Sequence, residues 1–435
     1  MKKHCFIPII ALVNSIFLGT NSIGTTIASC NDRSNSNVTS PVLSLDNQKM
    51  AVAKDFLKSY YLSKDLYYDC DFSQYISNSN FLEYVDEKVK SSAYKLQVYD
   101  VDDKQNYKLN LECVESYDIS DATYFKFNVD ILFNYKNCDV LSGYGEQNLI
   151  KIEADDLGVN KISDWYIPYD EYDVFVRGEL SSLPRKSVWE HEESQKLLKR
   201  QKNENMRLKN SYAQAAKNQN PERSYDTAEK DEEQFLRASG SLHSLNKHNI
   251  VVWATNNYNK TNPTSGNPSQ VSSYYDFSTI PNNFDCTNFV SHAILAGGAP
   301  VYDTGYSGIQ GSGWYFRNIS NRSSSWSGVN NLYSFLTTNT TRGPKATSIA
   351  YSNYWAPSGT PRPYDYGDLI QFHNGTTWGH SGVITTMIPL SGSSTTIEAG
   401  VTYRSSSSNY SFNKRQSEIY SGRSRRVLVL DGYYS

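Results

Sequence analysis

The chain has 435 residues, of which 38% are hydrophobic and 20% are charged, and its formal net charge at pH 7 is −3. This length predicts two or three domains with ordinary hydrophobic cores. The small negative charge gives no electrostatic reason to expect nucleic acid as a partner. Tyrosine is abundant, with 34 copies. Exposed tyrosines would suit a surface that grips carbohydrate or peptide, although codon bias would give the same count.

The N-terminus has the pattern of an export signal. Lys2 and Lys3 precede an apolar run over residues 5–18, and small residues follow it, as in a secretory signal peptide over 1–30. The apolar run is too short for a comfortable membrane span. The stretch Ile-Ala-Ser-Cys that ends at Cys30 also resembles a bacterial lipobox, in which Cys30 would carry a lipid anchor. Simple cleavage of the signal is the open alternative, and both predict an extracellular or cell-envelope protein.

A first folded unit is expected over residues 45–183, after a polar Asn/Ser-rich tether over 31–44. Apolar positions at helical spacing predict a helix over 46–63. Strict alternation of apolar and polar residues predicts strands over 107–114 and 124–135. A helix followed by long antiparallel strands is an α+β arrangement. It is similar to the small cone-shaped fold of the nuclear-transport-factor-2 type, a likeness that implies a binding role.

Residues 184–241 differ in character from the sequence on either side. They are dense in charge of both signs, and their few apolar residues, among them Leu197, Leu198, Met206 and Leu208, do not sustain a heptad pattern. We therefore predict a solvated helical linker between two folded units, with a short partner-binding coiled coil as the alternative.

A second unit is expected over residues 242–435. Its predicted elements are helices over 245–259 and 283–298, a strand-turn-strand segment over 367–387, and strands over 394–404 and 424–432. The Asn374-Gly375 pair supplies the turn of the hairpin. A helix that starts with a cysteine and precedes an antiparallel sheet is the part of this unit that carries chemistry.

The cysteines show no metal-binding spacing. Of the six in the chain, three lie in the first unit, at Cys70, Cys113 and Cys138. A disulfide between two of these three, formed outside the cell, is one interpretation. The other is a buried thiol, which is favoured for Cys113 because it shares an apolar strand face with Leu109 and Leu111. No C-x-x-C pair is present, so zinc ribbons and thioredoxin chemistry are unsupported. Cys286 stands alone in the second unit, and we expect no disulfide partner for it.

The position of Cys286 favours a reactive thiol. Pro281 interrupts the chain before it, Asp285 can cap the helix that follows, and Gly297-Gly298 ends that helix. At the start of a helix, free N–H groups and the helix dipole stabilise an anion, which lowers the pKa of a thiol and makes it a better nucleophile. A packed, inert cysteine at a helix end is the alternative interpretation.

A thiolate nucleophile needs a base. Six histidines follow the signal: His191, His243, His248, His292, His373 and His380. His292 lies six residues after Cys286 and therefore on another side of the helix. His380 opens an alternating strand, from which its side chain can face the helix across the surface of the sheet. A structural or exposed role is the general alternative for any one histidine.

Three motifs carry a resemblance to a known family. The stretches D-C-T-N-F-V-S-H-A-I-L-A-G-G (285–298), Y-G-D-L-I-Q-F (366–372) and W-G-H-S-G-V-I (378–384) occur in this order. Together they resemble the bacterial putative amidase domain family, which is related to CHAP-type and papain-like cell-wall cysteine hydrolases. The likeness covers roughly the second unit and implies a papain-like α+β fold. It makes Cys286 the nucleophile and His380 the base.

The resemblance also implies the rest of the site. A polar residue on the next strand orients the imidazole in related groups, and Glu398 matches that position. Asp368 is the rival, although a turn residue is the role we favour for it. The backbone N–H of Cys286 would bind the oxyanion, with the Asn283 side chain as a second donor. The implied reaction is acyl transfer to the thiolate from an amide, followed by hydrolysis, with no metal or organic cofactor.

An exported bacterial enzyme of this kind would most naturally act on amide bonds in peptidoglycan, and the first unit would then dock to the wall or to a partner. Four tryptophans could line a groove for sugar or peptide or could pack in the core: Trp314, Trp326, Trp355 and Trp378. Two other functions stay open. One is a secreted cysteine protease that acts on proteins, and the other is a non-catalytic surface binding protein that retains the fold.

Overall fold

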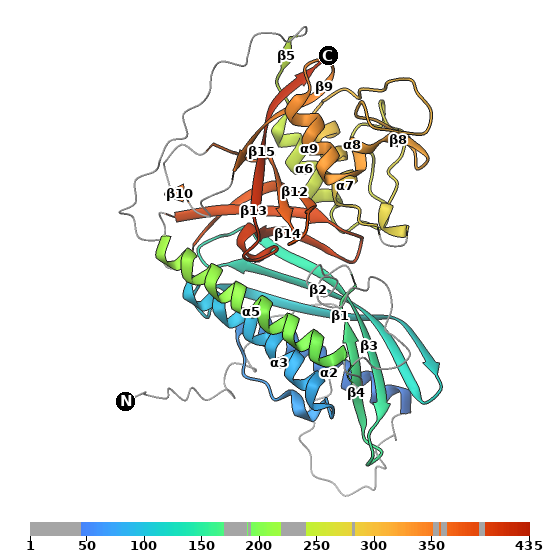
Figure 1. The fold of residues 1–435 in the computed structure, drawn as a ribbon, viewed down its shortest axis with the longest axis vertical. Helices are drawn as coiled ribbons and strands as arrows, with labels where there is room; N and C mark the ends of the chain where they lie inside the picture. The colour runs from blue at the N-terminus through green and yellow to red at the C-terminus, as the bar shows by residue number, and fades with distance from the viewer. Residues whose placement is uncertain are drawn as a thin grey trace, which may run out of the picture. The chain divides into compact units, whose positions relative to one another are not determined.

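The computed structural model describes residues 45–168, 189, 193–218, 241–280, 283–350, 356–357, 363–390 and 396–435. They belong to one compact unit in which helices pack on antiparallel sheet (Figure 1). The α+β class predicted from the sequence is therefore confirmed. The expected signal, Cys30 and the tether lie outside the described residues. Within these ranges no helix combines the length and the hydropathy that a membrane span requires.

The N-terminal part contains two helices and a four-stranded antiparallel sheet. The elements are α2 (Leu45–Leu66), η1 (Phe72–Gln74), α3 (Ser79–Ala93), η2 (Tyr94–Gln97), β1 (Lys104–Ile119), β2 (Ala122–Tyr135), β3 (Leu141–Ala154) and β4 (Asn160–Tyr166). Helix α2 confirms the predicted helix, whereas α3 was not predicted. Helix α3 begins after Asn78, whose side chain accepts a hydrogen bond of 3.0 Å from the N–H of Phe81, a typical N-cap.

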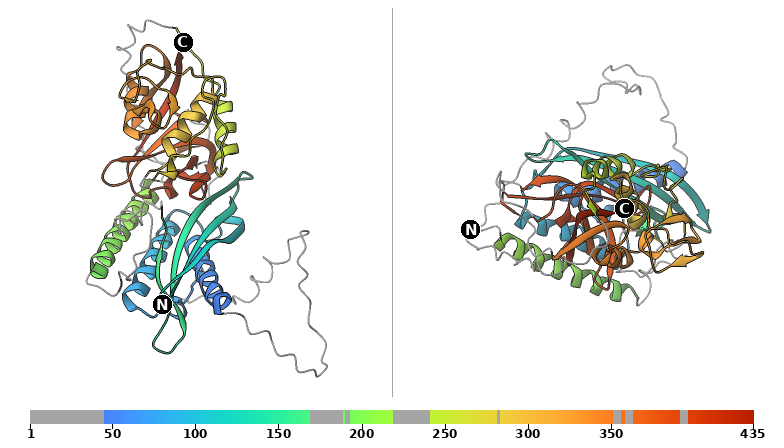
Figure 2. Two further views of the ribbon diagram at one scale, coloured as in Figure 1. Left: turned by 90° about the vertical axis from the view of Figure 1, so that its right-hand side faces the viewer. Right: turned by 90° about the horizontal axis from the view of Figure 1, so that it is seen from above.

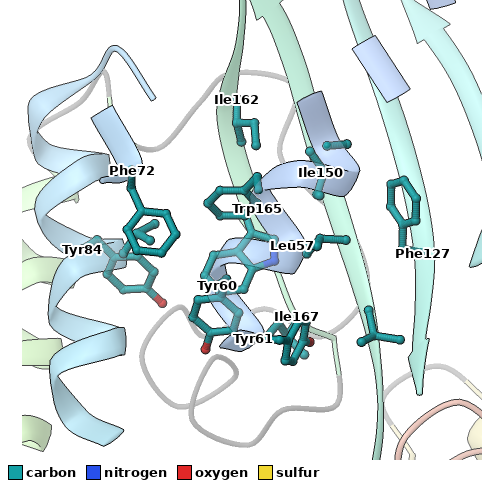
Figure 3. Packing of buried hydrophobic residues seen from close by; sticks show 14 of the residues in the cluster. Leu57, Tyr60, Tyr61, Phe72, Tyr84, Phe127, Ile150, Ile162, Trp165 and Ile167 are labelled. Carbon is teal, nitrogen blue, oxygen red and sulfur yellow. The ribbon is translucent and has the colours of Figure 1, made fainter. Parts of the chain in front are cut away.

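The core of this part lies between the helices and one face of the sheet. The alternation predicted for β2 is confirmed, because its core-facing side chains are at most 2% exposed: Phe125, Phe127, Val129, Ile131 and Phe133. Figure 3 shows how Leu57 and Tyr60 of α2 lie against Trp165 of β4. The ring centroids of Tyr60 and Trp165 are 4.5 Å apart, in an edge-to-face contact.

Many tyrosines lie in cores and not on the surface. The most deeply buried ones, each at most 1% exposed, include Tyr61, Tyr84, Tyr135, Tyr144 and Tyr166. Several of their hydroxyls form hydrogen bonds, as Tyr61 does with the Glu146 carboxylate at 2.8 Å. At these positions tyrosine serves packing in the core.

Helix α5 (Glu193–Asn218) corresponds to the predicted linker. Its helical character is confirmed, but the expectation of a solvated spacer is wrong. Several of its side chains are at most 6% exposed: Leu197, Leu198, Leu208, Tyr212 and Ala215. The helix runs alongside α3 (Figure 2), and Asn205 donates a hydrogen bond of 2.7 Å to the carbonyl of Glu87. Buried polar residues such as Gln201 and Asn205 fill the apolar stripe, so hydrophobic spacing alone did not reveal it.

The C-terminal part contains the helices α6 (Lys247–Asn257), η5 (Phe277–Thr279), α7 (Cys286–Ala296), α8 (Ser324–Ser327), α9 (Val329–Thr338) and η6 (Gln416–Glu418). Its strands are β5 (Leu242–His243), β6 (Ile309–Gln310), β7 (Phe316–Asn318), β8 (Asn321–Ser323), β9 (Gly343–Ala350), β10 (Ala356–Pro357), β11 (Leu369–His373), β12 (Trp378–Pro389), β13 (Thr396–Arg404), β14 (Tyr410–Arg415) and β15 (Arg425–Tyr434). The predicted helices are α6 and α7, and the predicted strands are β11, β12, β13 and β15. Strands β9 and β14 were not predicted.

One antiparallel sheet of twelve strands runs through the described residues. Its order is β1-β2-β3-β14-β13-β12-β11-β15-β5, with β4 also on β3, β9 on β15 and β10 on β13. The start of β3 joins the two parts by pairing with β14, where Gly145 lies opposite Tyr410. A Cβ atom at Gly145 would lie 2.5 Å from the Tyr410 ring, so this junction requires glycine. The two parts are thus joined directly and are not held apart by a linker.

The two faces of the C-terminal strands pack against different elements. Helices α6, α7 and α9 lie on one face of these strands (Figures 1 and 2). Leu369, Val383 and Leu428 belong to the core on that face. On the other face, a smaller core is formed by Ile370, Phe372, Ile384, Val401, Ile419 and Tyr420. Successive residues of a strand point to opposite faces, so neighbouring residues of β11 and β12 alternate between these two cores.

Candidate functional site

The structure places Cys286 as the sequence predicted, at the first residue of α7. The helix ends at Gly297, and Gly298 follows with a φ of 98°. The Cys286 side chain is 3% exposed, at the end of the helix where backbone N–H groups point outward and favour an anion. Among the residues that the structure describes, no cysteine forms a disulfide. The sulfur therefore lies buried at the end of the helix whose N–H groups favour an anion, and it forms no disulfide with a described residue.

Asp285 does not cap α7 as expected. Its backbone has φ −98° and ψ 0°, and its side chain makes no cap hydrogen bond. The carboxylate instead accepts hydrogen bonds from Arg404 Nε at 2.8 Å and from the N–H of Phe277 at 3.1 Å, and also from Tyr274 and the Asn288 amide. Burial raises the pKa of Asp285 to about 7. The residue thus anchors the start of α7 to the end of β13.

Arg404 is the centre of this anchor, and it was not identified from the sequence. Its side chain is fully buried and forms ion pairs with both Asp285 and Asp276. Its Nη1 also donates a hydrogen bond of 2.7 Å to the carbonyl of Lys260. The position at the end of an alternating strand gave no signal for this role, because a terminal arginine is usually exposed.

Ser381 shows which face of β12 meets α7. Its Oγ lies 3.5 Å from Thr287 Oγ1 of α7 and accepts a hydrogen bond of 3.2 Å from Gln371. His380 is the preceding residue of the same strand, so its side chain points to the other face. The His380 imidazole therefore lies on the face of the second core, beside Phe372, and its pairing with Cys286 stays a prediction. The hydrophobic pattern defined the strand, but it did not distinguish its two buried faces.

The His380 imidazole is fully buried among aromatic rings. Its centroid lies 4.2 Å from that of Tyr403, 5.5 Å from that of Tyr420 and 6.1 Å from that of Phe372. Burial lowers the pKa of His380 to about 3, so the ring is neutral at pH 7. Neither Tyr403 nor Tyr420 had been singled out from the sequence.

Cys286 and His380 nevertheless lie at the same end of the sheet. The residue after Cys286 contacts the residue after His380, through the pair Thr287 and Ser381. The residue before Cys286 is also fixed there, since the N–H of Asp285 donates a hydrogen bond of 3.0 Å to the carbonyl of Ser405, just beyond β13. The structure thus brings the two chain segments together while the helix and the imidazole occupy opposite faces.

Glu398 does not orient His380. Its partner across the sheet is Ile388, eight residues along β12 from His380, which corresponds to roughly 26 Å at the usual rise of a strand. The buried carboxylate accepts hydrogen bonds from Tyr99 at 2.8 Å and Ser417 at 3.1 Å. It also pairs with Arg415 at 3.2 Å. Burial raises the pKa of Glu398 to about 7. The carboxylate therefore holds the N-terminal and C-terminal parts together.

The two remaining candidates differ in their outcome. Asp368 has the turn role that we favoured: its carboxylate accepts hydrogen bonds from the N–H groups of Asp365 at 2.7 Å and Leu430 at 2.9 Å, and it pairs with Lys247. Asn283 is exposed, and its N–H donates to the carbonyl of Ile280 at 3.1 Å. The role of Asn283 in binding an oxyanion stays a prediction.

The other ring side chains considered in the sequence are mostly structural. His292 accepts a hydrogen bond of 3.2 Å from the N–H of Gly266 and packs against Trp253, away from the start of α7. Trp314 and Trp326 are fully buried, with centroids 4.8 Å apart, so neither lines a groove. Trp378 is half-buried, with the guanidinium of Arg426 4.2 Å from its ring centroid. Trp355 and His191 lie outside the described residues.

Comparison with known protein families gives a match in the C-terminal part of the chain. Residues 244–425 match the model of a family described as a putative amidase domain. The matched region begins just before α6 and ends at the first residue of β15, so it contains both Cys286 and His380. The C-terminal part is therefore amidase-like, which indicates amide hydrolysis. No curated protein and no solved structure matches the chain.

Proposed function

We propose that the chain is a cysteine-dependent amide hydrolase, with Cys286 as the nucleophile and His380 as the base. The observation that carries this proposal is the position of Cys286. It is the first residue of a buried helix, inside the region that matches the amidase family. Of the described cysteines, Cys286 alone begins a helix, where the dipole and free N–H groups favour the thiolate.

The reaction is acyl transfer. The Cys286 thiolate attacks the carbonyl carbon of the amide, and the backbone N–H of Cys286 donates a hydrogen bond to the resulting oxyanion. His380 takes the thiol proton and passes it to the leaving amine, which leaves an acyl thioester on Cys286. Water then attacks the thioester, with His380 as the base, and releases the acid.

Proton transfer requires the imidazole to come within about 3 Å of the sulfur. The end of β12 suits such a movement. The register of β11 and β12 shifts between Phe372 and His373, so His380 occupies the last regular pair before the turn. The ring is neutral, as a base must be before it accepts a proton. Rotation of the ring past the end of the strand, toward the start of α7, would complete the pair.

For the substrate we propose an amide bond in bacterial peptidoglycan. The support is the N-terminal sequence, in which Lys2 and Lys3 precede a short apolar run that ends before Cys30. Peptidoglycan is the abundant polymer with amide bonds that an exported bacterial hydrolase would encounter. The protein would act in the cell envelope, either secreted or attached by lipid at Cys30.

A second candidate is a binding protein that keeps the amidase fold without activity. One observation favours it: the His380 ring packs against Tyr403 and Tyr420 on the face opposite α7. The rate of thiol alkylation at pH 7 separates the two candidates. Cys286 in an active hydrolase reacts faster than a free model thiol, whereas Cys286 in a binding protein reacts no faster.

Digestion of purified peptidoglycan and of casein tests the proposed activity. We expect the wild type to release new amino groups from peptidoglycan, and Cys286→Ala and His380→Ala to release none. Cys113→Ala is the matched control, because Cys113 lies half-buried on β1 and should leave activity unchanged. Cleavage of casein with peptidoglycan untouched would replace the wall substrate by protein. Equal digestion by wild type and Cys286→Ala would contradict the mechanism.

A further inference from the structure

A cleft of about 150 Å³ lies between the N-terminal part and the region of β13, β14 and η6 in the C-terminal part. One wall comes from α2, α3, η2 and β3 and includes Lys64, Lys88, Lys95 and Glu146. The opposite wall comes from β13, β14 and η6 and includes Lys414 and Glu418. The cleft therefore exists only because the N-terminal part is packed on the amidase-like domain.

The charges that line this cleft do not balance. Its walls carry four lysines and two glutamates. Glu146 is paired with Lys64 at 2.9 Å, and Glu418 with Lys95 at 3.5 Å. Glu418 also pairs with Lys104, behind the wall, at 3.2 Å. Both carboxylates are thus already engaged with lysines, and the cleft keeps an excess of positive charge.

Lys414 stands out among these lysines. Its side chain is nine-tenths buried, and its Nζ lies 4.0 Å from the centroid of the Tyr144 ring. Within the described part of the chain, it has no carboxylate at ion-pair distance and no side-chain hydrogen bond. Burial and the nearby Lys64 lower the pKa of Lys414 to about 8, which still leaves it mostly protonated at pH 7. Glu418 and Glu146 attract Lys414 only from beyond ion-pair distance, so a ligand carboxylate in direct contact with it would stabilise the buried ammonium.

Neither Cys286 nor His380 lines the cleft, but residues that contact their chain segments do. Tyr403 and Tyr420 line it, and these are the rings that contact the His380 imidazole. Ser405 lines it too, and its carbonyl accepts the hydrogen bond from Asp285, the residue before Cys286. A molecule in the cleft would therefore lie next to the end of the sheet where Cys286 and His380 come together.

We propose that this cleft binds a carboxylate of the substrate, with Lys414 as its ion-pair partner. That the ligand is a substrate rests on the proposed function. The substrate class is then peptides that carry a free carboxylate close to the amide that is cleaved. It also gives the N-terminal part a role, since α2, α3 and β3 supply one wall of the site.

Binding to the full-length Cys286→Ala protein tests this proposal without requiring turnover. The probes are acetyl-Ala-Ala-Glu and its uncharged analogue acetyl-Ala-Ala-Gln-amide, measured by titration calorimetry at low salt. We expect the acid to bind about tenfold more tightly than the amide, or better, because a buried ion pair forms only with the acid. The double variant Cys286→Ala with Lys414→Met should lose this preference for the acid. The double variant with Lys414→Arg should retain most of it.

Lys108→Met in the same background is the matched control, because Lys108 is exposed on β1 and does not line the cleft. It should leave both affinities unchanged. Urea unfolding verifies that Lys414→Met is folded. Equal binding of the two probes, no binding of the acid at millimolar concentration, or an unchanged preference in Lys414→Met would overturn the carboxylate site. An inactive wild type that still prefers the acid through Lys414 would refute the proposed function and leave the binding site standing.

Discussion

Replacement of Glu398 by glutamine separates the role that the family resemblance implies from the role that the structure shows. If Glu398 oriented the base, its loss would lower kcat by as much as about 10⁴-fold, as the loss of the orienting carboxylate does in other triads. In the structure the carboxylate lies eight residues along the sheet from His380 and bonds Tyr99, Ser417 and Arg415. We therefore expect Glu398→Gln to keep kcat within about twofold of the wild type.

The cost to stability can be derived from the same contacts. Glutamine keeps one oxygen to accept from Tyr99 and Ser417, but it loses the ion pair with Arg415, which retains Asp103. It also places an amide donor near the Gln416 amide and the N–H of Ser417, which now donate to the carboxylate. At pH 4, where the carboxyl is protonated in the folded protein and the ion pair is already absent, we expect the misplaced amide donor to cost about 1–3 kcal/mol in the free energy of unfolding.

The pH dependence gives a second, independent readout. The pKa of Glu398 is raised from 4.5 in the unfolded chain to about 7 in the folded protein, so the folded state binds the proton more tightly. The contribution of this group is therefore present below pH 4.5 and is lost as the pH rises toward 7, by about 3 kcal/mol in total. Glu398→Gln removes this term, so its stability should fall less steeply than that of the wild type over that range.

The measurements are steady-state hydrolysis of peptidoglycan fragments and urea unfolding at several pH values. Asp368→Asn is the control, since Asp368 is also buried but bonds Asp365, Leu430 and Lys247 and not the candidate catalytic residues. It should leave kcat unchanged as well. A hundredfold or greater loss of kcat in Glu398→Gln, with normal stability and a normal Asp368→Asn enzyme, would refute this reasoning.

Three further predictions concern the contacts around the site. Arg404→Met leaves Asp285 buried without its cation, so urea unfolding should show a free energy of unfolding lower by about 3–5 kcal/mol. A change below about 1 kcal/mol would contradict the role of Arg404 in anchoring α7. Asp285→Asn should flatten the loss of stability between pH 4 and 7, because the folded pKa of Asp285 is raised to about 7; an unchanged pH profile would argue against this cause. Leu208→Ala should cost about 2–4 kcal/mol if α5 is packed, whereas a solvated helix would lose less than about 0.5 kcal/mol.

Elements with strong local patterns could be predicted from the sequence. The strict alternation in β2 and the cysteine and glycine pattern around α7 depend on neighbouring residues, and both elements formed where expected, although the Asp285 side chain does not cap the helix. The packing of α5 could not be predicted in this way, because its contacts with α3 use buried polar groups such as Asn205. A helix of mixed charge with few apolar residues gives no local sign of which side will be covered.

The candidate site shows the same limit. The position of Cys286 follows from local sequence. Both faces of β12 are buried, so the face that meets α7 is decided by elements distant in the sequence. Alternation predicts that His380 and Ser381 point apart, but it does not say which of them meets the helix. The wrong assignment of Glu398 has a related cause: the order of strands was correct, but the register between β12 and β13 is a long-range property.

The central claim is that Cys286 forms a covalent acyl intermediate. Rapid acid quenching of the protein during hydrolysis of peptidoglycan fragments, followed by intact-mass and peptide mapping, tests it most directly. The account predicts an added acyl mass on the peptide that contains Cys286, which is absent in Cys286→Ala and unchanged in amount in Cys113→Ala. Hydrolysis at the full rate with no added mass, or with the mass on another residue, would contradict it.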